Sequence, residues 1–371
     1  MKSLVRFFGF NSIVDRREQI EWTSKLRWAR LGSFACLFSI LSVVTSAAFA
    51  QSDVTPLRVQ VFSGAYTSMT VHIADELGFF SKNKLKVEKI AAQSSSAAIA
   101  AMLGGSLDVI ESAPDLVLSN IDKGLDLKFL MANEVKNYAT LVASNKLDLP
   151  NLSKGYPAMM QDLKGKRVGV NAIGASLYLS ATIMLKDAGM NNDDVQFVAT
   201  GTAGNTFAAW KAGAVDAQFT FAPIPELLEA LGLARPIMVL GDSGPDILRF
   251  QGLYSGWVTR GDFIQKNKPA ADAYVRSIQE AIAWIRDPAN QSKLLELAKK
   301  YSPVAGMSPA ENDAVLVKVI QNYRPFWGSE ISEETIEKWN DYSLRNGLIK
   351  RRIAFDRVVY SGAPKCTKAC K

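Results

Sequence analysis

The chain has 371 residues, of which 48% are hydrophobic and 21% charged, a composition typical of globular proteins and not of disordered chains. This length allows two domains of about 100–200 residues each. The formal net charge is +7, but residues 1–50 alone carry seven basic and three acidic residues, so the remainder is close to balanced. So small an excess, without a basic run, argues against nucleic-acid binding.

The first 50 residues have the pattern of a secretory signal peptide. Basic residues precede an uncharged segment over 31–52, and this segment contains Ala48-Phe49-Ala50. Small residues at the first and third of these positions fit the pockets of signal peptidase. We therefore expect cleavage between Ala50 and Gln51 and a periplasmic location for residues 51–371. The alternative is an uncleaved anchor, since about 20 apolar residues can span a bilayer.

Downstream of the leader, predicted strands alternate with predicted helices. Alternating, β-rich segments predict strands at 57–63, 85–92, 108–112, 127–132 and 140–144, and again at 166–171, 195–199, 215–221 and 237–240. After residue 244 the chain is expected to be mostly helical, with helical spacing of apolar residues at 271–286, 311–323 and 333–344. This order is typical of α/β folds, in which helices cover both faces of a parallel sheet.

Two segments about 108 residues apart have nearly the same sequence. Residues 100–109 read AAMLGGSLDV and residues 208–217 read AAWKAGAVDA, and an Ala-Pro pair follows each of them. An internal duplication of this kind predicts two related α/β lobes with a ligand cleft between them. The predicted lobes are 51–145 with 242–371 (lobe 1) and 146–241 (lobe 2).

The residue types provide no catalytic or metal-binding constellation. His72 is the only histidine, so the common zinc sites cannot be assembled within one chain. There is no G-x-S-x-G motif and no phosphate-binding loop. Beyond Gln51 the only cysteines are Cys366 and Cys370, which either pair in an oxidising compartment or belong to an unstructured end. We expect a binding protein and not an enzyme, without cofactor or metal.

Small and polar residues occur where each predicted strand ends and the next helix begins, in both lobes. Ligands of open α/β sheets bind at such points, because backbone N–H groups at helix N-termini point outward and favour anions. The alternative is that the serines merely cap helices. The predicted ligand-binding residues are Ser63, Gly64, Ala65, Tyr66, Thr67, Ser94, Ser95, Ser96, Ala113, Pro114, Gly174, Ala175, Ser176, Gly201, Thr202, Thr220, Phe221 and Pro223.

The predicted loops at 63–67, 94–96 and 174–176 contain no charged residue. A bound anion would therefore be held mainly by N–H and O–H donors, and the basic residues outside these loops that are candidates for contact are Arg58, Lys128 and Arg260. Aromatic side chains that either line the cleft or belong to the core are Tyr66, Tyr178, Phe219, Phe221 and Trp257.

Several segments together indicate a family. Residues 162–170 read DLKGKRVGV, residues 174–176 read GAS and residues 185–189 read LKDAG; upstream, residues 74–80 read ADELGFF and residues 105–109 read GSLDV. As a set they resemble the substrate-binding proteins of nitrate/sulfonate/taurine-type ABC transporters (NMT1/THI5-like and SsuA-like proteins), which include relatives that bind thiamine-precursor pyrimidines. The resemblance implies a type II periplasmic binding protein-like fold, with two α/β lobes joined by a two-segment hinge.

The resemblance also implies a function. Such a protein, here expected as a monomer, captures a small anionic or aromatic/heterocyclic molecule of the sulfonate, nitrate, taurine or pyrimidine type. It then delivers the ligand to an inner-membrane ABC permease with a cytoplasmic ATPase. The expected hinge segments are 144–151 and 240–244. The alternatives are a ligand-binding partner of a membrane sensor and, less favoured because 51–365 contain no cysteine and one histidine, an enzyme like the pyrimidine synthase or desulfinase of the same fold.

Overall fold

The computed structural model describes residues 54–201, 203–249, 251–303 and 308–366, and all structural statements below concern these residues. The predicted signal peptide and its cleavage point fall outside them. Within the described ranges, no helix combines the length and the apolar character that crossing a membrane requires.

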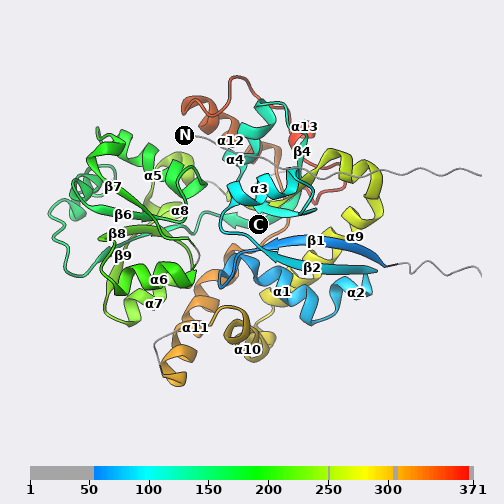
Figure 1. The fold of residues 1–371 in the computed structure, drawn as a ribbon, viewed down its shortest axis with the longest axis horizontal. Coiled ribbons are helices and arrows are strands. Elements are labelled where there is room, and N and C mark those ends of the chain that lie inside the picture. The colour runs from blue at the N-terminus through cyan, green and yellow to red at the C-terminus, as the bar shows by residue number, and fades with distance from the viewer. Residues whose placement is uncertain (1–53, 202, 250, 304–307, 367–371) are drawn as a thin grey trace, which may run out of the picture. The chain divides into compact units, whose positions relative to one another are not determined.

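The strands of the described residues form three sheets (Figure 1). Strands β1 (Thr55–Val61) and β2 (Leu85–Ala91) pair in parallel. A second sheet has the order β3-β10-β4, from Ile110–Ser112, Gln251–Arg260 and Leu127–Lys136. A third has the order β7-β6-β8-β5-β9, from Gln196–Ala199, Arg167–Val170, Ala217–Thr220, Thr140–Ser144 and Ala234–Val239. An isolated parallel bridge between Val59 and Val109 connects the first two sheets, which we call sheet system 1; the five-stranded sheet is sheet system 2.

The sheets are mixed and not purely parallel, which differs from the sequence prediction. Strand β10 runs antiparallel to both β3 and β4, and β5 runs antiparallel to both β8 and β9. Both exceptions directly follow a passage of the chain from one sheet system to the other. The remaining pairs of the five-stranded sheet, β6 with β7 and β6 with β8, are parallel as expected.

Helices cover the sheets as the alternation predicts. Their bounds are α1 Met69–Glu76, α2 Phe79–Lys82, α3 Ser95–Leu103, α4 Pro114–Asp122, α5 Ser176–Asp187, α6 Ala203–Lys211, α7 Ile224–Ala230, α8 Leu240–Ser243, α9 Gly261–Arg286, α10 Gln291–Tyr301, α11 Pro309–Tyr323, α12 Glu333–Arg345 and α13 Phe355–Val358. Helix α9 is kinked at Asn267, two residues before Pro269, which lacks the N–H that a helix interior needs. In Figure 1, α5 lies on one face of the five-stranded sheet and α6 and α7 lie on the other.

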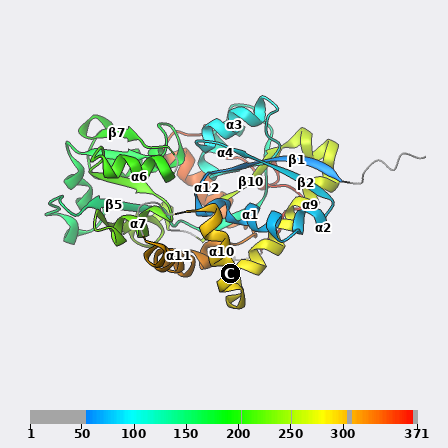
Figure 2. The same ribbon diagram turned by 60° about the horizontal axis from the view of Figure 1, so that its bottom comes forward.

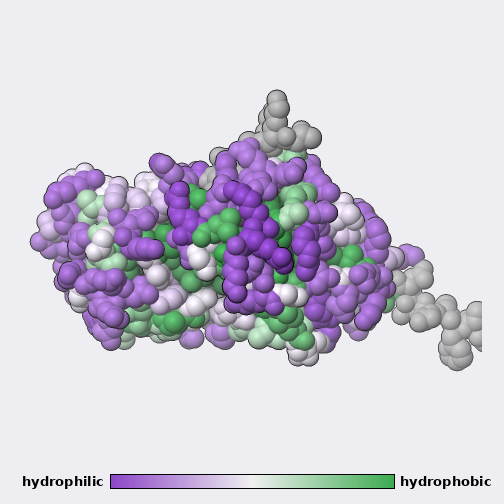
Figure 3. Space-filling view, turned by 90° about the horizontal axis from the view of Figure 1, so that it is seen from above, coloured by the Kyte–Doolittle hydropathy of each residue, from purple (hydrophilic) through white to green (hydrophobic). Residues whose placement is uncertain are grey.

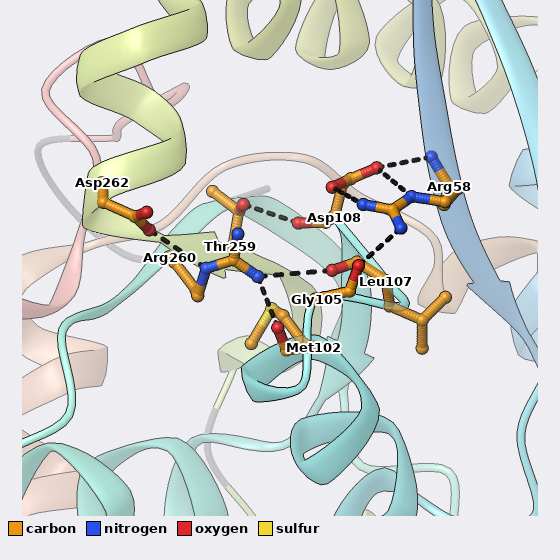
Figure 4. Close-up of polar contacts among 8 residues, drawn as sticks. All are labelled: Arg58, Met102, Gly105, Leu107, Asp108, Thr259, Arg260 and Asp262. Atoms are coloured by element: carbon orange, nitrogen blue, oxygen red, sulfur yellow. Dashed lines mark hydrogen bonds and ion pairs between the residues drawn. The ribbon is translucent and has the colours of Figure 1, made fainter. Parts of the chain in front are cut away.

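The sequence repeat corresponds to a repeated structural feature. Arg58 at the first strand donates two hydrogen bonds to the Asp108 carboxylate, at 2.7 and 3.0 Å, and a third to the glycine carbonyl three residues earlier (Figure 4). Arg167 does the same with Asp216, at 2.6 and 3.0 Å, and with the corresponding glycine. In each lobe, the repeated Gly-x-x-Asp turn is thus attached to the strand by a bidentate arginine.

The chain passes between the sheet systems at two segments that lie side by side. One is residues 137–139, between β4 and β5, and the other begins at Leu240, after β9. The Leu240 N–H donates to the Ala139 carbonyl at 2.8 Å. A Cβ on Gly241 would lie only 2.1 Å from the Asn137 carbonyl oxygen, so only glycine permits this approach. The first hinge prediction, 144–151, is therefore wrong, because those residues come after β5, which pairs within sheet system 2.

The predicted lobe limits remain a prediction, but the strand pairing favours a different first boundary. Residues 140–144, assigned above to lobe 1, pair only with strands of sheet system 2. We therefore place the first boundary near residue 139. The C-terminal helices also contact both systems: α11 lies beside α7, as Figure 2 shows, and Lys318 bonds Glu229 at 2.7 Å.

A large aromatic core lies under sheet system 1. Tyr66 and Trp257, which we considered as possible cleft residues, are fully buried there. Tyr66 stacks on Trp327 with 5.9 Å between centroids, and Trp257 meets Tyr274 edge-on at 5.7 Å. Their size and apolar faces make them core residues.

The surface is mainly hydrophilic on the face shown in Figure 3. Among the described residues, the exposed large hydrophobic side chains are Val54, Leu103 and Ile173.

Candidate ligand-binding cavity

A cavity of about 110 Å³ lies at the carboxyl ends of strands from both sheet systems. A single water needs only about 10–15 Å³ by this kind of measure, so the space is large enough for a small organic molecule. The lining residues are Phe62, Ser63, Ala65, Thr67, Gln93, Ser95, Glu111, Ser112, Ala113, Tyr138, Asn171, Ser176, Leu177, Gly201, Thr206, Gln218, Phe219, Thr220, Phe221, Ala222, Ile224, Tyr254 and Ser255.

The cavity brings together half of the residues predicted to bind ligand. Those in its lining are Ser63, Ala65, Thr67, Ser95, Ala113, Ser176, Gly201, Thr220 and Phe221. Those outside its lining are Gly64, Tyr66, Ser94, Ser96, Pro114, Gly174, Ala175 and Pro223. Thr202 falls outside the described residues. Ligand contact by any of them stays a prediction.

Three of the residues outside the lining have other contacts. The Ser94 hydroxyl accepts from the Ala97 N–H at 3.2 Å and caps α3, which was the alternative role for these serines. The Ser96 hydroxyl donates to the Gly174 carbonyl at 3.5 Å. That last bond joins residues of the two predicted lobes.

The Ser176 hydroxyl donates its hydrogen bond to a buried carboxylate of the protein and does not point free into the cavity. Ser176 opens α5, and its Oγ donates to Asp115 Oδ1 at 3.0 Å. The same oxygen accepts from the Leu116 N–H in the first turn of α4, at 2.7 Å. Burial raises the pKa of Asp115 to about 6, even though these hydrogen bonds favour its charged form. The protein's own acid thus contacts Ser176, at the start of α5, which is one of the three places where an anionic ligand was expected.

A second pair of acids lies on the sheet system 1 side. Glu111, on β3, lines the cavity, and its Oε1 accepts from Ser255 Oγ at 2.7 Å and Asn133 Nδ2 at 3.0 Å. The Thr67 hydroxyl donates to its other oxygen. Ser255 also contacts the Glu134 carboxyl behind it. Burial and the neighbouring Glu111 carboxyl raise the pKa of Glu134 well above its usual range.

Amide and hydroxyl groups form the facing wall in sheet system 2. Gln218, on β8, accepts from the Trp210 indole N–H at 2.6 Å and donates to Thr200 at 2.8 Å. Its side chain has room because β6 carries glycine at 169, where a Cβ would lie 2.9 Å from Gln218. The glycine of the VGV strand therefore positions a cavity residue.

Aromatic rings complete the lining. Phe219 and Phe221 were predicted, whereas Phe62, Tyr138 and Tyr254 were missed. Tyr138 contacts Phe221 and Tyr254 with centroids 5.2 and 5.6 Å apart. Burial raises the pKa of Tyr138 and Tyr254 well above the usual range, so both keep neutral hydroxyls. The remaining candidate, Tyr178, packs instead on Phe197 at 4.9 Å and is not in the lining.

None of the three basic residues considered for anion binding lines the cavity. Arg58 is bound to Asp108, as described. Arg260 donates to Asp262 and to the Met102 carbonyl (Figure 4). Lys128 donates to the carbonyls of Asp356 and Arg357, at 2.7 and 3.1 Å. All three are held by intramolecular contacts, so the cavity lining does not support an anion-binding role for them, and ligand contact stays a prediction.

The other reactive side chains lie apart from the cavity. His72 is buried and stacks on Tyr301 at 3.9 Å between centroids, and burial lowers its pKa to about 4. Cys366 is disulfide-bonded, and Cys370 lies outside the described residues. Over the described ranges, no group of three or more histidines, cysteines and acids is placed to hold a metal ion.

Two α/β sheet systems, crossed twice by the chain and enclosing a cavity, define the periplasmic binding protein fold. The model of the family "NMT1/THI5 like" matches residues 66–291, more than half of the chain. The protein belongs to this family, as the sequence resemblance predicted.

Solved structures agree on the fold. A structure from Bordetella bronchiseptica RB50 is 22% identical, with a TM-score of 0.69, over 85% of this chain and 96% of that one. The alkanesulfonate-binding protein SsuA from Xanthomonas axonopodis pv. citri, bound to MOPS, is 17% identical with a TM-score of 0.64, over 84% and 99%. The periplasmic nitrate-binding protein NrtA from Synechocystis PCC 6803 is 16% identical with a TM-score of 0.54, over 68% of each chain. No curated protein matches the sequence.

Proposed function

We propose that this protein is a periplasmic solute-binding protein that captures a small organic molecule in the cavity and delivers it to an ABC importer. The observation that carries the proposal is a cavity lined from both sheet systems, mainly by hydroxyl, amide and aromatic side chains. Such groups bind and orient a ligand. Family membership and the sulfonate- and nitrate-binding proteins of the same fold support it. Its partners would be an inner-membrane permease and a cytoplasmic ATPase.

Ligand binding would favour a closed arrangement of the two lobes. In the present arrangement two hydrogen bonds join the lobes, one between Ser176 and Asp115 and one between Ser96 and Gly174. A ligand that contacts both walls of the cavity binds this arrangement better than an open one, so it shifts the population toward closure. The side-by-side segments at 137–139 and 240–241 are the natural axis of that motion.

Binding is preferred to catalysis because the cavity lacks the groups that bond-making requires. Among its described lining residues there is no cysteine, histidine or lysine, and each serine lacks a neighbouring base of that kind. Glu111 is the exception as an ionisable acid, and three side-chain donors already bind it.

Native mass spectrometry of protein purified from its own periplasm tests the proposal. We expect a retained small molecule that is lost on denaturation. Ser63→Trp, at an exposed position of the cavity lining, should abolish retention, whereas Ser81→Trp, at an exposed position of α2, should not. Equal retention by both variants would place the ligand elsewhere, and a protein that never retains or binds a small molecule would refute the proposal.

A further inference from the structure

Glu111 is the one carboxyl side chain in the described lining of the cavity. Glu111 is only 3% exposed and borders the cavity directly. Among the described lining residues none is Lys, Arg or His, so no basic side chain of the lining balances this acid. A buried carboxylate is costly unless donors or an opposite charge compensate for lost water. The three side-chain donors to Glu111 are Thr67, Asn133 and Ser255, of which Thr67 and Ser255 also line the cavity.

A second carboxyl, that of Glu134, lies next to Glu111 and shares a hydroxyl partner with it. Glu134 and Glu111 both contact the Ser255 hydroxyl, and Tyr323 donates to Glu134 at 2.9 Å. Two acids this close do not both ionise readily. Burial and the neighbouring carboxyl raise the pKa of Glu134 well above its usual range, which favours the neutral form of Glu134.

The aromatic residues provide an independent observation. Rings from both sheet systems line the same space: Phe62, Tyr138, Phe219, Phe221 and Tyr254. The faces of aromatic rings attract cations by about 0.5–2 kcal/mol each, and rings grouped around one space are the usual means of recognising alkylammonium groups. A cavity that combines aromatic rings with a carboxylate suits an organic cation better than a cavity with only rings or only a carboxylate.

An acid of the protein already lies at the starts of two helices, α4 and α5. Asp115 accepts from Leu116 at the start of α4 and from Ser176 at the start of α5. Its carboxylate offsets the partial positive charge of both helix ends. A ligand anion in the cavity would therefore meet Glu111 without gaining these two helix termini.

We propose that the ligand is a small organic cation, with its protonated amine, amidine or quaternary ammonium group against Glu111 and the aromatic rings. This inference rests on the proposed function and narrows the ligand class. The cation supplies the counter-charge that the cavity lining lacks. Sulfonate and nitrate, by contrast, would add a negative charge beside Glu111.

Calorimetry with three probes that share a phenyl ring and carry a positive, no or a negative charge tests the charge preference. The probes are benzyltrimethylammonium, benzyl alcohol and benzenesulfonate, titrated into the full-length mature protein. We expect the cation to bind at least about tenfold more tightly than the other two. Glu111→Gln should weaken cation binding by about thirtyfold or more, as for loss of a buried charge partner. Glu296→Gln, which removes an exposed acid paired with Lys293 on α10, should leave it unchanged.

Each outcome decides the matter. If Glu111→Gln fails to fold by circular dichroism, the ranking of the three probes on the wild-type protein still stands as the test. Binding of the alcohol or the sulfonate in preference to the cation overturns the inference and leaves the proposed function intact. Absence of heat from all three overturns the inference, and the mass spectrometry above then judges the proposed function separately.

Discussion

Asp115→Asn should change how stability depends on pH. The folded-state pKa of Asp115 is about 6, against 3.8 for the ordinary side chain. The folded protein therefore binds more protons than the unfolded chain between these values, so the contribution of Asp115 to stability is fully present below about pH 4 and is lost as the pH rises through 6. At 1.36 kcal/mol per pH unit, the loss amounts to about 3 kcal/mol.

Urea unfolding from pH 4 to pH 8 measures this effect. The asparagine variant keeps an oxygen for Leu116 and Ser176 but cannot ionise. Its stability relative to the wild type should therefore rise by about 2–3 kcal/mol between pH 4 and pH 7.5, most steeply near pH 5. The measured quantity is the change of the free energy of unfolding with pH. The N–H donors of the new asparagine amide do not titrate, so they do not affect this change. Asp193→Asn, at an exposed acid, should follow the wild-type curve. Parallel curves for Asp115→Asn and wild type would refute the reasoning.

Two further substitutions test backbone positions. Gly241→Ala places a Cβ 2.1 Å from the Asn137 carbonyl oxygen, so we expect the free energy of unfolding in urea to fall by about 1–3 kcal/mol. Gly204→Ala, whose Cβ meets nothing within 4 Å, should be neutral or stabilising. Equal stability of the two variants would count against a close contact between the two crossing segments. Gly169→Ala displaces Gln218 from the cavity wall, so we expect weaker binding of the retained ligand in calorimetry, and unchanged affinity would show that Gln218 makes no contact.

The lobe framework could be predicted because local patterns determine it. The Gly-x-x-Asp repeat at Asp108 and Asp216 recurs with the same arginine contacts in both halves. Strand β10 was missed because its glycines resemble turn residues. Gly256 is glycine for another reason: a Cβ there would lie 2.5 Å from the Met131 carbonyl of the neighbouring strand. A contact between residues 125 positions apart leaves no local pattern.

The cavity was half predicted for the same reason. Small residues after strands, such as Ser63 and Ser176, follow a local rule for helix N-termini and were found. Glu111 and Ser255 lie inside strands, and Tyr138 lies in the crossing segment. Their spacing resembles that of core residues, and only the tertiary arrangement turns them toward a common space. The acid pair, which fixes the charge of the site, is therefore invisible from the sequence.

The order β3-β10-β4 has a consequence for how the chain acquires its structure. Residues 110–112 and 127–136 have no direct ladder with one another, because the strand that joins them comes from residues 251–260. A ribosome or export channel that still holds residue 260 therefore keeps the N-terminal half without its middle strand. The sheet β3-β10-β4 can therefore be completed only after most of the chain has emerged, because its middle strand comes from residues 251–260.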